Sequence, residues 1–256
     1  MTKKPTILVV NDDGCEALGL EALVEVARRH GNVTVVAPNS SRSGSGHAIT
    51  MSRPLRIRRF KQVNGVDYYR TNGTPVDCVK LGQKAILRGQ KIDLVLSGIN
   101  HGANSSSSLL YSGTMAAAIE ASFENLKSVG FSLLDYSSKA DFSAAQVFAD
   151  KIISDVLAHD MPPHICLNVN IPKLTLEEIK GIKITRQAQG FWNEDLEERL
   201  DPFGRPYYWL TGHLEETDTD EDTCLWALKN GYVSVQPVQF DMTAHQHISS
   251  LKFLEQ

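Results

Sequence analysis

Two adjacent carboxylates are the first residues in this sequence whose type and position could carry chemistry. Asp12 and Asp13 directly follow Thr6–Val10, an apolar and largely β-branched run that is typical of a strand buried on both faces. Carboxylates this close repel each other unless a cation or a proton lies between them. A divalent metal meets that need, whereas capping of the next helix requires only one Asp. The pair therefore predicts a metal site, with helix capping as the alternative.

A loop dense in hydroxyls and glycines comes after the second strand-like run. It spans residues 37–50 and includes Ser43, Gly44 and His47. Its backbone N–H groups could approach a phosphate, although the segment alone fits a flexible surface loop equally well. The loop lacks the Lys of a Walker motif, and Ile49 stands where a dinucleotide fingerprint needs its third Gly. A phosphate-binding role for this loop therefore needs support from the rest of the sequence.

Two further segments place oxygen donors and free N–H groups after strand-like runs. Asn100 follows the run 93–97, and its short neutral side chain suits a hard cation. Ser112–Thr114 open an Ala-rich helix, and the unpaired N–H groups of a helix start favour anions. Capping by Ser112 or Thr114 explains the same residues and does not exclude anion binding. These segments predict neighbouring positions for a cation and an anion.

Strands and helices that could position these residues alternate through the first two-thirds of the chain. The predicted strands are 6–10, 33–37, 92–97, 129–134 and 165–170, and the predicted helices are 18–30, 76–88, 114–125 and 142–157. This alternation predicts an α/β fold with a mainly parallel sheet and helices on both faces. Such sheets bind ligands at the carboxyl ends of their strands. A hairpin is expected at 54–70, with Asn64 and Gly65 at its tip.

The pattern changes after residue 171 and becomes β-rich. Short strand-like runs lie at 182–185, 206–210 and 232–237, and the acidic stretch 215–222 is predicted to be a solvated loop. The chain is therefore divided into an α/β core, residues 1–171, which carries the site, and a β-rich extension, residues 172–256. The aromatic side chains of the extension could stack on a base or lie in a subunit interface, and the interface is preferred. They are Trp192, Tyr207, Tyr208 and Trp209.

Composition excludes several classes of protein. The 256 residues suffice for a large buried core. With 26 Lys and Arg against 30 Asp and Glu, the net charge of −4 argues against a protein that binds nucleic-acid polymers. The four cysteines form no CxxC pair, which favours ordinary thiols in a reducing compartment. Without a signal-peptide core or an apolar run of about 20 residues, we expect a cytoplasmic protein that does not enter a membrane.

The motifs form an ordered set. They are Asn11–Gly14, Ala37–His47, Gly73–Pro75, Ser97–Asn104, Tyr111–Thr114 and Gly231–Val235. From Ile7 to about Ala244 this set resembles the SurE family. The resemblance implies a Rossmann-like core, a C-terminal oligomerisation region for dimer or tetramer assembly, and a metal-dependent 5'/3'-nucleotidase that hydrolyses nucleoside monophosphates. The sequence departs from the usual family pattern at Ser105–Ser108 and Ala121, which bear on loop shape and substrate preference.

The resemblance also implies roles for individual residues. The residues carried over as metal ligands are Asp12, Asp13, Ser43 and Asn100. The residues carried over as the lining of the phosphate and substrate pocket are Asn11, Gly44, Asn104, Ser112, Gly113 and Thr114. The four metal ligands are all oxygen donors, which suit one divalent Mg²⁺ or Mn²⁺, with Ca²⁺ possible in crystals.

The expected reaction is in-line attack of water on the phosphate, with Asp12 and Asp13 as catalytic residues and no covalent phosphoenzyme. The expected partners are nucleoside monophosphate substrates and further copies of the chain, in a homodimer or homotetramer. His47 is a weaker candidate for protonating the leaving group. A non-hydrolytic protein that senses nucleotides or phosphate is the alternative, because binding and catalysis share most of these motifs.

Overall fold

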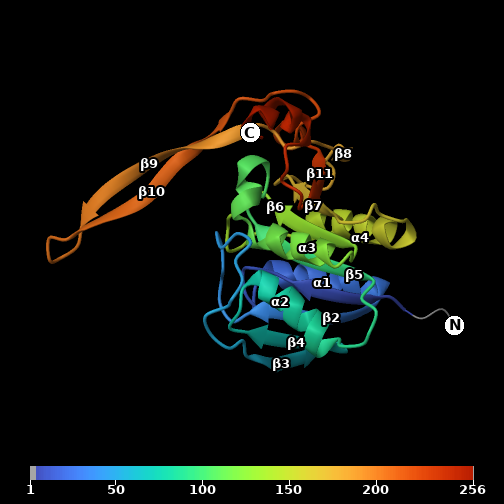
Figure 1. The fold of residues 1–256 in the computed structure, drawn as a ribbon. Coiled ribbons are helices and arrows are strands. Elements are labelled where there is room, and N and C mark those ends of the chain that lie inside the picture. The colour runs from blue at the N-terminus through green and yellow to red at the C-terminus, as the bar shows by residue number, and fades with distance from the viewer. Residues whose placement is uncertain (1–3, 256) are drawn as a thin grey trace.

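The computed structural model describes residues 4–255. Its centre is a nine-stranded sheet with the strand order β3-β4-β2-β1-β5-β6-β7-β11-β8 (Figure 1). The strands from β4 to β7 are parallel, whereas β3 and β11 run antiparallel to β4 and β7. The strands are β1 Thr6–Val10, β2 Asn32–Pro38, β3 Ile57–Val63, β4 Val66–Thr71, β5 Leu94–His101, β6 Ser128–Leu133, β7 Ile165–Ile171, β8 Ile182–Ile184 and β11 Val233–Gln239. The predicted α/β class is confirmed.

Helices cover both faces of the sheet, as the sequence predicts. In β1, Ile7 and Val9 pack with α1 and α4 on one face, while Leu8 and Val10 pack with α2 and α3 on the other. Because side chains alternate across a strand, a strand that is apolar at every position needs cover on both sides. The helices are α1 Leu18–His30, α2 Pro75–Leu81, α3 Gly113–Phe123, α4 Ser143–Ala158 and α5 Cys224–Lys229.

Several element boundaries coincide with the sequence prediction. β1 and α1 have the predicted ends, and β3 and β4 form the expected hairpin around Asn64 and Gly65. Both turn residues have positive φ, 51° and 79°, which Asn and Gly tolerate well. The predicted helix 76–88 is instead split, because α2 is followed by a π-helical turn, Gly82–Ile86. The turn begins at Gly82, because glycine is a poor helix former and a Cβ at this position would lie only 2.7 Å from Leu8 Cδ2.

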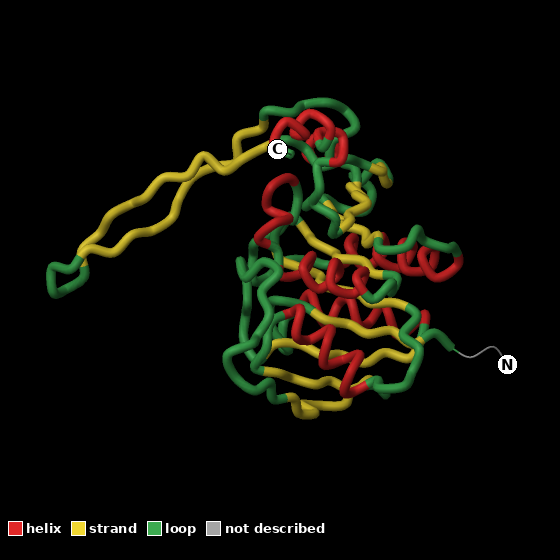
Figure 2. The backbone as a smooth tube through the Cα atoms, in the orientation of Figure 1, coloured by secondary structure: helices red, strands yellow, loops and turns green. Residues whose placement is uncertain are grey.

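A two-stranded antiparallel ribbon extends away from the sheet (Figures 1 and 2). It consists of β9 Gly190–Leu200 and β10 Pro206–Glu216. The sequence prediction misses β9, ends β10 at residue 210 and begins a loop at 215, which is still strand. The physical reason is that both faces of the ribbon are exposed, so its residues lack the alternation that identifies a half-buried strand.

The chain after residue 171 also contributes to the central sheet. β11 pairs with β7 from Ser234–Asn170 to Gln239–Ile165, and β8 pairs with the other edge of β11. The short helix α5 was not predicted. The division into residues 1–171 and 172–256 remains a prediction. Within residues 4–255, no helix combines the length and apolar character that crossing a membrane requires.

Candidate active site

Asp12 lies just beyond β1, where it meets the start of α3. The Thr114 hydroxyl donates a 2.6 Å hydrogen bond to Asp12 Oδ1. Gly113 permits this approach, because a Cβ at that position would lie 2.8 Å from Asp12 Cβ. Asp12 itself is only 3% exposed. The structure therefore brings a predicted metal ligand into direct contact with the predicted anion site.

Both carboxylates at this edge have pKa values above the usual range, so their ionisation is less favourable than in water. Burial raises the pKa of Asp12 to about 6, with the Thr114 hydrogen bond opposing this rise and the charge of Asp13 adding to it. Burial also raises the pKa of Asp13, against the effect of nearby His101. A positive ion close to both groups would favour their charged forms.

Two oxygen atoms next to β1 are buried without a hydrogen-bond partner among the described residues. They are Asn11 Oδ1 and Asp13 Oδ2. The Asn11 side chain is held in place, since its Nδ2 donates to the carbonyl of Gly14 at 2.9 Å. Unpaired buried oxygens are costly, and carboxylate and amide oxygens suit hard cations. The residues present therefore fit a divalent metal.

Such a metal would need neutral ligands as well as carboxylates. Within residues 4–255, no group of three or more His, Cys, Asp or Glu side chains is placed to hold an ion. Asn100 lies in β5, just past the pairing of Ser97 with Val10 of β1. Its amide nitrogen donates to the carbonyls of His101 and Gly102, at 3.1 and 2.8 Å. The side-chain oxygen of Asn100 is thus the atom left to bind a cation.

The loop after β2 approaches the same edge of the sheet. The N–H of Arg42 donates to the carbonyl of Asp12 at 2.7 Å, and the N–H of Gly46 donates to the carbonyl of Tyr111 at 3.0 Å. The loop therefore reaches from the end of β1 to the turn before α3. The loop carries Ser43 and Gly44, which are exposed. These two predicted residues lie between the two hydrogen bonds that hold the loop, one from Arg42 and one from Gly46.

Arg42 is a residue to which the sequence analysis assigns no role. Its Nη2 donates to the carbonyl of Asn72 at 3.5 Å, while its Nε is buried without a partner among the described residues. The flanking hydroxyls of Ser41 and Ser43 share a 2.9 Å hydrogen bond. A guanidinium with an unpaired N–H suits a phosphate. In the sequence, the indication of such a role for Arg42 is that it is the single Lys or Arg in a loop rich in hydroxyl groups.

Asn104 is placed differently from the other predicted residues. Its N–H donates to Asn170 Oδ1, its Nδ2 donates to Ser132 Oγ, and its carbonyl accepts from Asn168 Nδ2, each at 2.8 Å. These bonds link the loop after β5 to β6 and β7. The contacts of Asn104 support a role in holding the loop, and its contact with substrate stays a prediction. The two partner asparagines were missed by the sequence analysis, although Asn168-Val169-Asn170 interrupts an apolar strand.

α3 begins with a cap that leaves N–H groups available. Ser112 Oγ accepts from the N–H of Met115 at 3.0 Å. The N–H groups of Gly113 and Thr114 come before the first intrahelical hydrogen bonds, so the helix does not satisfy them. The Thr114 N–H also stabilises the ionised Asp12 carboxylate. Capping and anion binding, the two alternatives for this segment, are therefore compatible.

The side chain of His47, from the loop after β2, contacts α3 at Glu120 and Phe123. Its Nε2 lies 3.0 Å from Glu120 Oε2, and its ring stacks on Phe123 with centroids 5.4 Å apart. Glu120 lies about 12 Å along the helix from Ser112, at 1.5 Å per residue. Lys80 also binds Glu120. His47 thus belongs to a cluster with Glu120 and Lys80, and its role in protonating the leaving group stays a prediction.

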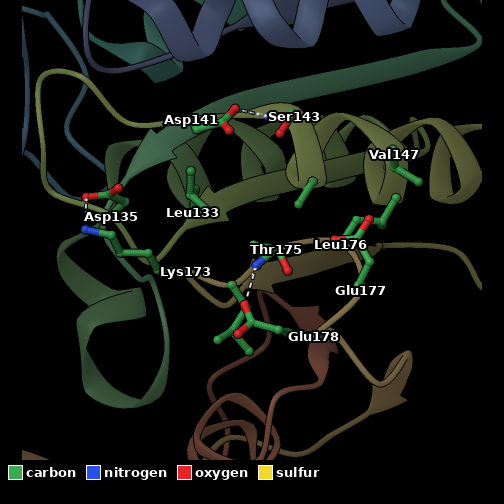
Figure 3. Close-up of a pocket in the computed structure, with 12 residues that line it drawn as sticks. Leu133, Asp135, Asp141, Ser143, Val147, Lys173, Thr175, Leu176, Glu177 and Glu178 are labelled. Atoms are coloured by element: carbon green, nitrogen blue, oxygen red, sulfur yellow. Dashed lines mark hydrogen bonds and ion pairs between the residues drawn. The ribbon is translucent and has the colours of Figure 1, made fainter.

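A separate hollow lies between α4 and the segment after β7 (Figure 3). Its volume is about 530 Å³. Asp135 in its wall binds Lys173 at 3.1 Å, and Asp141 accepts from the N–H of Ser143 at 2.9 Å. None of the predicted site residues lines this hollow. The candidate site is therefore the edge formed by β1, the loop after β2 and α3.

The fold and this edge together define a class of protein. A mainly parallel α/β sheet presents buried acidic oxygens beside the free N–H groups of a helix start, at the edge where such sheets bind ligands. Residues 7–194 match the family model described as survival protein SurE. The chain belongs to the SurE family.

Relatives match over nearly the whole length of the chain. A protein of Cytophaga hutchinsonii named 5'-nucleotidase SurE is 52% identical over 248 residues, 97% of this chain and 96% of its own. A protein of Flavobacterium johnsoniae with the same name is 50% identical over 250 residues, with 97% and 96% covered. The crystal structure of the SurE protein from Aquifex aeolicus superposes with a TM-score of 0.86 at 41% identity, covering 98% of this chain and 100% of that one. The family resemblance is confirmed.

Proposed function

We propose that the protein is a metal-dependent 5'/3'-nucleotidase, a phosphoric monoester hydrolase that converts nucleoside monophosphates to nucleosides and phosphate. The observation that carries the proposal is the hydrogen bond between Asp12 and Thr114, which places acidic oxygens beside an anion-binding helix start. The 5'-nucleotidase name of relatives about 50% identical to this chain supports the same activity.

The metal ligands in this proposal are Asp12, Asp13, Ser43 and Asn100. The unpaired buried Asp13 Oδ2 supports this set, as does Asn100, whose amide nitrogen donates to two carbonyls and leaves its oxygen as the possible ligand. The all-oxygen donors favour one Mg²⁺ or Mn²⁺. When bound, the ion supplies positive charge that offsets the charge of the phosphoryl group.

The chain's own residues bind and orient the reactants. The N–H groups at the start of α3, at Gly113 and Thr114, hold phosphoryl oxygens, and Asn11, Gly44, Asn104 and Ser112 complete the lining of the pocket. Asp12 or Asp13 orients a water molecule and accepts its proton as the water oxygen attacks phosphorus in line. The bond from phosphorus to the nucleoside oxygen breaks, and that oxygen takes up a proton from solvent. No covalent phosphoenzyme forms.

Phosphate release from AMP and GMP with added Mn²⁺, before and after exhaustive EDTA treatment, tests the function. We expect release that EDTA abolishes and Mn²⁺ restores. Binding of AMP without phosphate release would favour the alternative, a protein that senses nucleotides or phosphate. Activity that survives EDTA would contradict metal dependence.

Asp12→Asn tests the site itself. It keeps the shape of the side chain but removes the charge that a divalent cation requires, so we expect phosphate release to fall to background. Asp155→Asn is the matched control, because Asp155 is an exposed carboxylate on α4 that pairs with Lys151. Near-normal turnover of Asp12→Asn with metal supplied would show that the proposed site is wrong.

Assembly and location complete the proposal. We expect a homodimer or homotetramer formed through residues 172–256, and the exposed aromatic side chains of the β9–β10 ribbon support this. We expect the enzyme to act in the cytoplasm. Its four cysteines, all free and buried, are compatible with a reducing compartment.

A further inference from the structure

A cavity of about 330 Å³ lies where the ribbon meets the core. Its lining consists of Tyr111, Trp192, Glu194, Leu210, Thr211 and Gly212. The volume lies within the range of small-molecule sites in proteins. Two aromatic rings and a leucine supply apolar surface, and one carboxylate supplies a hydrogen-bond acceptor. This is the composition of a site for a flat ring system with polar edges.

The cavity adjoins the proposed phosphate site through Tyr111. This residue ends the 3₁₀ turn Ser106–Tyr111 and directly precedes Ser112, the cap of α3. Because Tyr111 lines the cavity and is bonded to Ser112, the cavity and the helix start are neighbours along the chain. The carbonyl of Tyr111 also accepts from Gly46 of the loop after β2. Phosphate site, loop and cavity thus meet at one residue.

The base of the ribbon is anchored to the same 3₁₀ turn. Trp192 Nε1 donates to Ser108 Oγ at 3.3 Å. Ser106 Oγ donates to the carbonyls of Ala188 and Gly190, at 3.0 and 3.3 Å. These contacts fix the first part of β9 beside Tyr111. They involve the segment 105–108, where the sequence departs from the usual family pattern.

The register of the ribbon places four of the lining residues, Trp192, Glu194, Leu210 and Gly212, on one face. Trp192 and Glu194 are two positions apart in β9, so their side chains point to the same side. Gly212 pairs with Glu194 and Leu210 pairs with Leu196. Gly212 has a φ of 141°, and a Cβ there would lie 2.3 Å from the carbonyl oxygen of Asn193, so the pairing of the two strands requires glycine at this position. The paired strands supply five of the six lining residues, and Tyr111 of the 3₁₀ turn supplies the sixth.

We propose that this cavity binds the purine base of the nucleoside monophosphate whose phosphate lies at the start of α3, an inference that rests on the proposed nucleotidase function. Tyr111 and Trp192 are 58% and 43% exposed, so both have ring surface free to stack on a base. A purine offers a larger face for stacking than a pyrimidine. Glu194, which only accepts hydrogen bonds when ionised, reads the amino donor of the base.

Kinetics with and without a base test this site. GMP and ribose 5-phosphate carry the same type of phosphate ester, but only GMP has a base. For Trp192→Ala we expect the ratio of kcat/KM for GMP to that for ribose 5-phosphate to fall about 10-fold, the lower part of the range for base stacking on an aromatic side chain. The fall should come from KM for GMP. Trp209→Ala, which removes an exposed indole from the opposite face of the same ribbon, should leave the ratio unchanged.

Glu194→Gln tests the reading of the base edge. GMP and IMP differ only in the 2-amino group, so we expect the wild-type protein to prefer GMP and the variant to lose part of that preference. An equal effect of Trp192→Ala and Trp209→Ala on the ratio, or an unchanged preference in Glu194→Gln, would overturn the base site. A wild-type protein that hydrolyses GMP and ribose 5-phosphate equally well would do the same. Failure to release phosphate from either substrate would overturn the nucleotidase function instead.

Discussion

The contact between Thr114 and Asp12 is the smallest unit on which the proposed site depends. It joins a hydroxyl from the first turn of α3 to a carboxylate at the end of β1. The hydrogen bond favours the ionised carboxylate, against the burial that raises the pKa of Asp12. The Thr114 hydroxyl therefore contributes to both the orientation and the charge of Asp12.

Thr114→Val keeps the shape of this side chain and removes the hydroxyl. We expect kcat/KM for AMP to fall about 10-fold or more, because a hydrogen bond to a charged group contributes about 1.5–3 kcal/mol. Phosphate release at saturating Mn²⁺ measures the effect. Thr114→Ser, which keeps the hydroxyl, is the control and should remain active. Equal activities of the Val and Ser variants would show that the hydrogen bond is not required.

The free energy of unfolding of the metal-free protein should depend on pH in a way that reflects the burial of Asp12. Its pKa is about 6 in the folded chain and about 4 in an unfolded one. Since folding raises this pKa, ionisation of Asp12 lowers the free energy of unfolding as the pH rises through that interval. Asn cannot ionise, so metal-free Asp12→Asn should be more stable than metal-free wild type at pH 7, by up to about 3 kcal/mol.

Calorimetry in EDTA measures this difference. The advantage of Asp12→Asn should shrink at pH 4, where Asp12 of the folded wild type is protonated. A variant that unfolds at a lower temperature than the wild type at both pH values would contradict the burial argument.

At the residue scale, local spacing predicts only part of the candidate site. Asp12, Asp13 and Thr114 could be singled out because a strand end and a helix start are visible in the sequence. The setting of Asn104 could not, because its partners Asn168 and Asn170 lie 64 and 66 residues away. Which side chain faces a cavity and which supports a loop is decided by such distant contacts.

At the scale of elements, α3 has two tasks. Its first turn presents N–H groups to the anion site, and its cap holds that turn in place. Ser112 provides the cap by accepting from the N–H of Met115. α5 offers an unrelated example of the same device, since Thr223 accepts from the N–H of Trp226. Comparing Ser112 with Thr223 therefore separates the effect of a lost cap on stability from its effect on phosphate binding.

Ser112→Ala and Thr223→Ala should each reduce stability by about 1 kcal/mol, the usual cost of a lost N-cap. Only Ser112→Ala should also reduce kcat/KM for AMP, because its helix turn carries the proposed phosphate site. Thermal unfolding and phosphate release, measured on both variants, give the comparison. A loss of activity in Thr223→Ala as large as that in Ser112→Ala would mean that stability alone explains the effect.

Elements with a clear apolar period could be predicted from the sequence, and exposed elements could not. β1 and α1 have one strongly apolar pattern each, and their predicted ends agree with the structure. β9 is exposed along nearly its whole length, so no apolar period marks it. The alternation of strands and helices predicts the core sheet, whereas the return of β11 to pair with β7 depends on contacts far apart in the chain.

At the scale of the whole molecule, the β9–β10 ribbon is the element whose two faces are both exposed to solvent in a single chain. Large apolar side chains on both of its faces are exposed, among them Leu196, Leu200 and Trp209. A two-stranded ribbon alone in water is at best marginally stable. A second copy of the chain, as proposed for the assembly, would bury these side chains.

Charges at the far end of the ribbon should disrupt that assembly. Leu200 and Phe203 are 63% and 81% exposed, and they lie at the end remote from Trp192. We expect the double variant Leu200→Glu, Phe203→Glu to have a smaller mass than the wild type in light scattering, because burying charged groups opposes association. Leu18→Glu, a charge on an exposed core residue, is the control. An unchanged mass would place the interface elsewhere.

The hydrogen bond from Thr114 to Asp12 has a consequence for how the enzyme matures. It closes a stretch of 102 positions along the chain. Contacts between residues so distant in sequence form more slowly than helices or hairpins, because the intervening chain must first be ordered. A nascent chain that ends before α3 contains Asp12 and Asp13 but lacks this hydroxyl donor and the α3 anion site. The rate at which activity returns during refolding would therefore measure how fast α3 packs against β1.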